Sequence, residues 1–370
     1  HSGVEEDLVR KIAEILAANK KIITCWAMGV TQQKHAVATI QEIVNMHLLR
    51  GAVGIPGAGL CPVRGHSNVQ GDRTMGIYEK PKEAFLMALD RNFGMQSPRE
   101  HGYDVVETIE AMDKGKVKVF MAMGGNFISA TPDSEFTGKA VQKVGLTVQV
   151  STKLNRAHLV TGEHALILPC LGRTEIDIQK DGPQFVTVEN SMGVVHTSRG
   201  NVKPASTQLK SEPAIVCELA DVVFSDSKLP WLEWKNNYDL IRNEIEKTIP
   251  GFNDYNKRVR NVDGFYLPNG PRKREFTTAS GKAHFTVNPS PNFSVPANHL
   301  VMMTIRTHDQ YNTTIYGLDD RYRGIKNERR VILMNRKDAE KLNLREKELV
   351  NIVSNQDGVE RVATQFHVIY

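Results

Sequence analysis

The chain has 370 residues, of which 40% are hydrophobic and 24% charged, a composition typical of a globular protein with room for two or three domains. Its formal net charge of +5 is spread without long runs, which fits an anionic cofactor or substrate and argues against nucleic-acid wrapping. No segment approaches the roughly 18 consecutive apolar residues of a membrane helix, and no signal-peptide pattern is visible. We therefore expect a cytoplasmic protein without a membrane segment and with no nucleic-acid partner.

Helices and strands alternate through the first half of the chain. Apolar residues recur at helical period from Leu8 to Leu16, and a buried strand at 21–26 and an amphipathic helix at 33–49 follow. The alternation resumes later, with helices predicted at 102–114 and 134–143 and strands at 117–123, 146–150 and 164–168. Such repeats predict layered, Rossmann-like α/β domains with largely parallel sheets.

The second half of the chain is organised differently. Between about 181 and 296 the alternation loosens, helices are predicted only at 212–224 and 232–247, and the stretch NPSPNFSVPAN indicates a domain linker. Strands are then predicted at 299–305, 330–334, 348–354 and 360–367, with a short helix at 338–342. This pattern predicts a mainly β, barrel-like C-terminal domain.

The four cysteines, at positions 25, 61, 170 and 217, form no C-x-x-C pair, so no iron–sulfur or zinc framework is expected in this chain. Their apolar neighbours predict reduced, buried thiols, which favours the cytoplasm, with a disulfide as the alternative. The histidines show no metal-ligand spacing either, and we expect no protein-held metal site.

A glycine-rich segment at 51–76 is the first candidate for chemistry. It holds seven glycines in 26 positions, whereas the chain average of 28 in 370 gives about two. Glycines let backbone N–H groups approach an anion closely, and these flank the possible donors Arg64, His66, Asn68 and Gln70. The segment matches neither a Walker A loop nor G-x-G-x-x-G, and a glycine-rich connector without a ligand is an equal alternative.

Two turns that follow predicted strands are further candidates. Gly124-Gly125-Asn126 comes directly after the strand at 117–123, and the turn at 27–32 follows the first strand. Ligands of open α/β sheets bind beyond the carboxyl ends of strands. Either turn alone is a weak signal, because such junctions are common.

The segment at 304–324 is the third candidate. It is rich in Arg, His, Gln, Asn and Tyr beside a predicted strand, which suits a polycyclic, polyanionic ligand. A solvated polar face is the alternative.

Together these segments resemble the large subunits of molybdopterin oxidoreductases, the dimethyl-sulfoxide-reductase superfamily, and within it the formate-dehydrogenase-like branch. WAMGVTQ and GAVGIPGAGLCPVRGHSNVQG are similar to its strand-end and pterin loops. MAMGGNF resembles its guanine-contacting turn, and LTVQVSTKLNRAHLVTGEHALILP the strand pair that follows. TIRTHDQYNTTIYGLDDRYRG is similar to the opening of its C-terminal cofactor domain. The four motifs occur in family order.

The resemblance implies four parts: the end of a first α/β cofactor domain at 1–70, a second α/β guanine-dinucleotide domain at 71–180, an irregular connection at 181–296 and an incomplete dinucleotide-binding domain at 297–370. It implies a bis-molybdopterin guanine dinucleotide with molybdenum, and a possible 4Fe–4S cluster in an N-terminal part that we expect to be missing here. Neither that cluster nor the protein ligand of molybdenum can be located in these residues. We therefore expect residues 1–370 alone to be an inactive fragment of a larger enzyme.

The resemblance also implies roles for single residues. Arg64 aligns with the arginine that orients an anionic substrate, and His66 could relay a proton, although formate dehydrogenases usually have glutamine there. That departure leaves the substrate open. The cofactor contacts implied are Gly29, Thr31, Gln32, Arg64, Gly65, Asn68, Gln70, Gly71, Gly124, Gly125, Asn126, Thr152, Lys153, Asn155, Arg306, His308, Gln310, Asn312 and Thr313.

The expected partners are a small-molecule substrate and an electron-transfer protein. Two alternatives stay open. One is a non-catalytic scaffold of the same fold, which would lack the polar pterin contacts. The other is a nucleotide-binding α/β protein without redox chemistry, which would need a phosphate loop or an acidic Mg²⁺ ligand beside the glycines.

Overall fold

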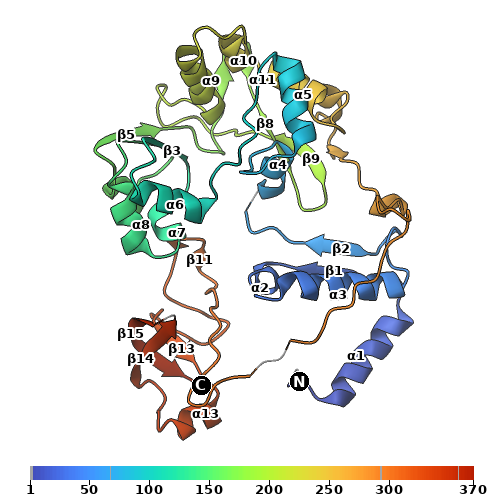
Figure 1. The fold of residues 1–370 in the computed structure, drawn as a ribbon, viewed down its shortest axis with the longest axis vertical. Coiled ribbons are helices and arrows are strands. Elements are labelled where there is room, and N and C mark those ends of the chain that lie inside the picture. The colour runs from blue at the N-terminus through green and yellow to red at the C-terminus, as the bar shows by residue number, and fades with distance from the viewer. Residues whose placement is uncertain (1–2, 67, 292–293, 357) are drawn as a thin grey trace. The chain divides into compact units, whose positions relative to one another are not determined.

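The computed structural model describes residues 3–66, 68–291, 294–356 and 358–370. The chain divides into two compact units (Figure 1). The first unit comprises His1–Gly125 and Asp133–Phe293, and the second Asn126–Pro132 and Ser294–Tyr370. None of the described helices is long and apolar enough to cross a membrane.

The first unit begins with helix α1 (Glu6–Ala18) and a two-stranded parallel sheet of β1 (Ile23–Trp26) and β2 (Gly59–Pro62). Helices α2 (Met28–Thr31) and α3 (Ala36–Leu49) connect the two strands. The Thr24 hydroxyl on β1 lies 2.7 Å from Nε2 of His47, which is fully buried in α3. Burial lowers the pKa of His47, so this contact fixes α3 to the sheet with a neutral imidazole.

The four cysteines are free thiols. Cys170 and Cys217 are buried as predicted, but Cys25 is exposed and Cys61 only partly buried. The prediction of four buried thiols was therefore wrong for the pair on β1 and β2. Among the described residues this sheet has two strands, and so small a sheet leaves side chains at these positions open to solvent.

The parallel α/β pattern predicted for the middle of the chain is confirmed. Strands β3 (Val119–Met123), β4 (Leu146–Ser151) and β5 (His164–Pro169) form a parallel sheet with β4 at its centre. Helices α6 (Val105–Asp113) and α8 (Ser134–Val141) contact each other and contribute buried apolar side chains (Figure 1). The topology places the carboxyl ends of the three strands at one edge.

The region after β5 is more regular than the sequence suggested. Strands β8 (Val186–Glu189), β9 (Val194–Ser198) and β10 (Phe265–Tyr266) form an antiparallel sheet with β9 in the middle. The predicted helix at 232–247 is two helices, α10 (Trp231–Asn236) and α11 (Tyr238–Thr248). They separate at Asn237, whose side chain accepts a hydrogen bond from the Asp239 backbone and caps α11.

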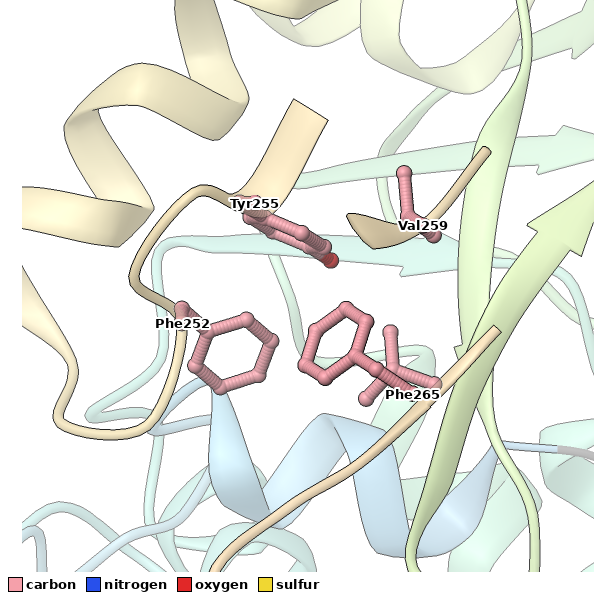
Figure 2. Close-up of a cluster of buried hydrophobic side chains, with 5 residues drawn as sticks. Phe252, Tyr255, Val259 and Phe265 are labelled. Atoms are coloured by element: carbon pink, nitrogen blue, oxygen red, sulfur yellow. The ribbon is translucent and has the colours of Figure 1, made fainter. Parts of the chain in front are cut away.

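A cluster of buried side chains lies against this antiparallel sheet (Figure 2). Phe252, Tyr255, Val259 and Phe265 are each at most 7% exposed, and Val195 of β9 completes the cluster. The three rings make edge-to-face contacts, with centroids 4.7 to 5.9 Å apart, an arrangement that stabilises aromatic pairs beyond their apolar burial.

The first unit also contains shorter elements. They are α4 (Val69–Thr74), α5 (Glu83–Phe93), η1 (Arg156–Leu159), β6 (Ile178–Gln179), β7 (Gly182–Pro183), α9 (Glu212–Val223), α12 (Tyr255–Arg258) and η2 (Pro271–Lys273).

The second unit is rich in β structure, as predicted. Strand β15 (Val359–Ile369) pairs parallel with β13 (Val331–Leu333) and antiparallel with β14 (Leu349–Gln356). The unit also contains α7 (Phe127–Ala130), α13 (Arg336–Lys341) and the hairpin of β11 (Gln310–Tyr311) and β12 (Thr314–Ile315).

The strand predicted at 299–305 is wrong. This segment has no regular secondary structure, and Val301 and Met303 are each 76% exposed. Apolar residues predict a strand only where a neighbouring strand supplies ladder hydrogen bonds, and none is described here.

One local ion-pair cluster gives a pH prediction. The Asp90 carboxylate accepts hydrogen bonds of 2.6 Å from the Ser97 backbone and from Arg99, and these lower its pKa to about 2. The pKa of this carboxyl is lower in the folded protein than in the unfolded chain. Ionisation of Asp90 therefore stabilises the folded state at a pH above the unfolded pKa. This stabilisation is lost as the pH falls from the unfolded pKa to the folded pKa.

We therefore expect Asp90→Asn to lower the melting temperature at pH 7 by roughly one or two degrees, and the difference from wild type to shrink between pH 5 and pH 2. Thermal melts across this range test it. Asp263→Asn, at an exposed position, is the matched control. A difference that stays constant with pH would contradict the assignment.

Candidate functional site

The carboxyl ends of β1 and β2 bring the first two candidate segments together. Because the strands are parallel, the turn that begins at Ala27 and the segment that begins at Val63 leave the sheet at one edge. The Val63 N–H donates to the Trp26 carbonyl at 2.7 Å, and a Cβ on Gly65 would lie 3.7 Å from Cε of Met28. The glycine-rich segment is therefore not one long loop, since it contains β2 and α4, and Gly65 lies beside α2.

Arg64 is an exposed residue at this edge. Its backbone N–H donates to the Ser191 hydroxyl at 3.2 Å, and its Nε and Nη2 donate to Oε1 of Gln70 at 3.3 Å. Within the part of the chain that the structure describes, its side chain has no carboxylate partner. The guanidinium is thus held at one side and retains donors for another ligand.

The buried carboxylate of Glu189 organises the segment that carries Arg64. Its Oε1 accepts from Nε2 of Gln70 at 2.7 Å, and its Oε2 accepts from the Thr74 hydroxyl at 2.6 Å. The Gln70 amide lies between this carboxylate and Arg64, so it links the two charged groups without a direct ion pair. Sequence reasoning missed Glu189, although the alternation in Val186–Glu189 was a signal for the strand that ends there.

Asn68 and Gly71 brace the same segment. Asn68 has a φ of 64°, its Oδ1 accepts from the Glu189 backbone at 2.9 Å, and its Nδ2 donates to Asp72 at 3.1 Å. A Cβ on Gly71 would lie 1.9 Å from this Oδ1, so a side chain at this position would displace the Asn68 amide. The side chains of Asn68 and Gln70, assigned to the pterin from the sequence, thus make hydrogen bonds within the protein here.

The structure places the other residues expected at this edge as follows. Gly29, Thr31 and Gln32 are exposed on or after α2, a Cβ on Gly29 would meet open space, and His66 is exposed two residues after Arg64.

A second edge, at the carboxyl ends of β3 and β4, brings Gly124 and Gly125 beside the segment that follows β4. The two glycines have φ of 70° and 77° with open space around a Cβ. Asn155 donates from Nδ2 to the Gly125 carbonyl at 2.8 Å and caps η1. Thr152 and Lys153 are exposed between β4 and Asn155.

His158 adds a buried imidazole near this second edge. Its Nδ1 lies 3.0 Å from the Asn155 backbone nitrogen and 3.1 Å from Oδ1 of the same residue. Among the described residues, the buried Nε2 of His158 has no hydrogen-bond partner. His158 was not among the site residues predicted from the sequence.

The second unit holds Asn126 together with the residues expected from 306 to 313. Nδ2 of Asn126 donates to the Thr313 hydroxyl at 3.3 Å, whereas its buried Oδ1 has no partner in the described part of the chain. Gln310 donates to the Asn312 carbonyl at 2.9 Å and accepts from Arg329 at 2.6 Å.

Two further residues of this segment have identified contacts. The His308 ring lies 4.6 Å from the Tyr322 ring, and the Arg306 carbonyl accepts from Arg323 at 3.5 Å. Among the described residues, no group of three or more His, Cys, Asp or Glu is placed to hold a metal ion.

Family comparisons match both units. Residues 7–222 match the family model described as molybdopterin oxidoreductase, and residues 300–369 match the one described as molydopterin dinucleotide binding domain. The chain belongs to the molybdopterin oxidoreductase family. The resemblance stated from the sequence is thereby confirmed at the level of the family.

Curated relatives agree with this assignment. An uncharacterized oxidoreductase of Mycobacterium tuberculosis is 54% identical over all of this chain and 48% of its own length. The protein YdeP of Escherichia coli is 45% identical over 95% of this chain and 47% of its own length. The alpha subunit of an F420-dependent formate dehydrogenase of Methanocaldococcus jannaschii is 26% identical over 72% of this chain and 38% of its own length. The chain thus spans about half the length of the first two relatives.

Proposed function

We propose that this protein is a molybdenum-dependent oxidoreductase that binds a bis-molybdopterin guanine dinucleotide and acts on a small anionic substrate of formate-like size. The observation that carries the proposal is Arg64, an exposed guanidinium fixed at the carboxyl edge of β1 and β2 without a carboxylate partner among the described residues. A cation held in this way is available to bind an anion.

The residues present fit the cofactor. The open backbone of Gly124 and Gly125 admits close approach of a ligand. Buried polar atoms without partners are costly unless a ligand satisfies them. One such atom in the described part of the first unit is Nε2 of His158, and one in the described part of the second unit is Oδ1 of Asn126. A guanine or pterin ring would satisfy either atom, because its edge carries both donors and acceptors.

The residues proposed to hold the cofactor fall into two groups. Those of the first unit are Gly29, Thr31, Gln32, Arg64, Gly65, Asn68, Gln70, Gly71, Gly124, Gly125, Thr152, Lys153 and Asn155. Those of the second unit are Asn126, Arg306, His308, Gln310, Asn312 and Thr313.

The bound cofactor supplies redox chemistry at its metal. Arg64 binds and orients the anionic substrate through the donors that Gln70 does not use. Glu189 holds Gln70 and Thr74 and so keeps the guanidinium in one orientation. His66, which is exposed two residues after Arg64, exchanges a proton with the substrate.

Three finer features belong to the same proposal: an electron-transfer partner, a 4Fe–4S cluster in the whole protein and a cytoplasmic location. The first is supported by the relative named as the alpha subunit of a formate dehydrogenase. The other two are supported by the likeness to that branch and by the sequence composition.

Cofactor analysis of the purified full-length protein tests the proposal. We expect about one molybdenum and two guanine nucleotides per chain after acid hydrolysis, and reduction of a dye with formate or another small anion. Lys153→Ala should lower the nucleotide content, whereas Lys228→Ala, at an exposed position after α9, should not. Protein without molybdenum would favour the scaffold alternative.

A further inference from the structure

Three sulfur atoms lie together on the first unit, beside but separate from the residues assigned to the cofactor. Cys25 of β1 and Cys61 of β2 are directly opposite each other in the parallel register. Sγ of Cys61 lies 3.8 Å from Sδ of Met192, in the turn between β8 and β9. Residues paired in this way have their side chains on the same face of the sheet.

The turn that carries Met192 is held in place. The Met192 N–H donates to Oδ1 of Asn190 at 2.9 Å, and the hydroxyl of the adjacent Ser191 accepts from the Arg64 N–H. One bond closes the turn and the other ties it to the segment that follows β2. The thioether is therefore held beside Cys61 before any ligand binds. This preorganisation reduces the conformational entropy that the protein loses on binding.

Cys25 and Cys61 are free thiols. Neighbouring strands lie roughly 4.8 Å apart, within the Cα separation of about 4.4–6.8 Å that a disulfide spans, so a disulfide is the alternative for this pair. A disulfide would leave the Met192 thioether beside Cys61 without a role.

A metal ion would use all three sulfurs. Sulfurs that each lie about 2.3 Å from one ion are themselves roughly 3.8–4.0 Å apart, close to the separation of Cys61 and Met192. Hard cations need oxygen ligands, and structural zinc sites take four ligands. Two thiols with one thioether are instead a soft ligand set, of the kind that selects Cu(I).

We propose that Cys25, Cys61 and Met192 form a three-sulfur binding site for a soft monovalent cation, Cu(I). On binding, the two thiols release two protons to solvent and form two copper–thiolate bonds, while the Met192 thioether donates a lone pair. No electron is transferred. Cys25 and Met192 are exposed and Cys61 is partly buried, so the ion can enter from solvent.

Anaerobic titration of the full-length protein with Cu(I), in competition with a chromogenic Cu(I) chelator, tests the site. We expect one tightly bound ion. Cys25→Ser and Cys61→Ser should each weaken binding by about 100-fold or more, because loss of a thiolate ligand exceeds the 10–100-fold effect of losing an outer-sphere partner. Met192→Leu, at a half-exposed position, removes a neutral thioether, which binds the ion more weakly than a thiolate does. It should therefore weaken binding less, by roughly tenfold, and leave folding unaffected. Cys217→Ser and Met95→Leu are the matched controls and should bind as wild type does.

X-ray absorption at the copper edge provides a second measurement. We expect sulfur ligands only, at about 2.3 Å. The proposal is overturned if wild type binds no Cu(I), if Met192→Leu and both serine variants bind it as wild type does, or if nitrogen or oxygen ligands dominate the spectrum.

Discussion

Arg64→Ala in the full-length protein is expected to lower kcat/KM by about 100- to 1000-fold, the range observed when one preorganised electrostatic donor is removed from an active site. The melting temperature should change by no more than roughly one degree, because the side chain is exposed and its hydrogen bonds to Gln70 are long, at 3.3 Å. Steady-state kinetics with the best small-anion substrate and a thermal melt together provide the test.

Two further variants separate the charge of Arg64 from its position. Arg64→Lys keeps the charge but loses the planar fork of donors, so it should retain part of the activity. Glu189→Gln keeps the volume at position 189 but removes a buried carboxylate that accepts two side-chain hydrogen bonds. It should lower both turnover and stability. If Arg64→Ala instead lost stability and activity to the same degree, Arg64 would have a structural role.

Phe252→Ala is expected to destabilise the first unit by about 3–5 kcal/mol, the range for removal of a buried aromatic ring. Phe252 is 1% exposed and contacts the rings of Tyr255 and Phe265, so the surrounding side chains have little freedom to fill the space (Figure 2). Equilibrium unfolding in denaturant, followed by tryptophan fluorescence, measures the change.

Two further variants give reference values for this change in stability. Tyr255→Phe removes only the hydroxyl that lies 2.7 Å from Oγ1 of Thr187, which should destabilise by about 1 kcal/mol. Val262→Ala, at a residue that is 99% exposed, should change stability by less than about 0.5 kcal/mol. A Phe252→Ala effect no larger than that of Val262→Ala would show that the cluster is not a stabilising core.

The sequence predicted the α/β part well because its elements carry strong local patterns. The strands at β3, β4 and β5 are short apolar runs, and α8 and α3 follow apolar spacing of helical period. The residues at the strand ends could be identified because parallel topology fixes their edge. The contact between Asn155 and Gly125 follows from that topology.

The glycine-rich segment contains a strand and a helix that the sequence did not predict. Gly59–Pro62 forms a strand although it begins with glycine and ends with proline, because β1 supplies the partner. Val69–Thr74 forms a helix although it contains Gly71. At β2 a tertiary contact thus overrides local propensity. Glu189 was missed for the same reason, since its partners Gln70 and Thr74 are more than a hundred residues away.

The second unit is not continuous in the chain, because it includes Asn126–Pro132 as well as the residues from Ser294 onward. Asn126 and Thr313, which are joined by a hydrogen bond, are 187 residues apart. During synthesis on the ribosome, Asn126–Pro132 therefore emerges long before the residues against which it packs. Contacts between such distant residues form slowly, and the hydrogen bond between Asn126 and Thr313 must wait until translation has passed Thr313. An mRNA truncated before that codon would yield a nascent chain in which this segment still lacks its packing partners.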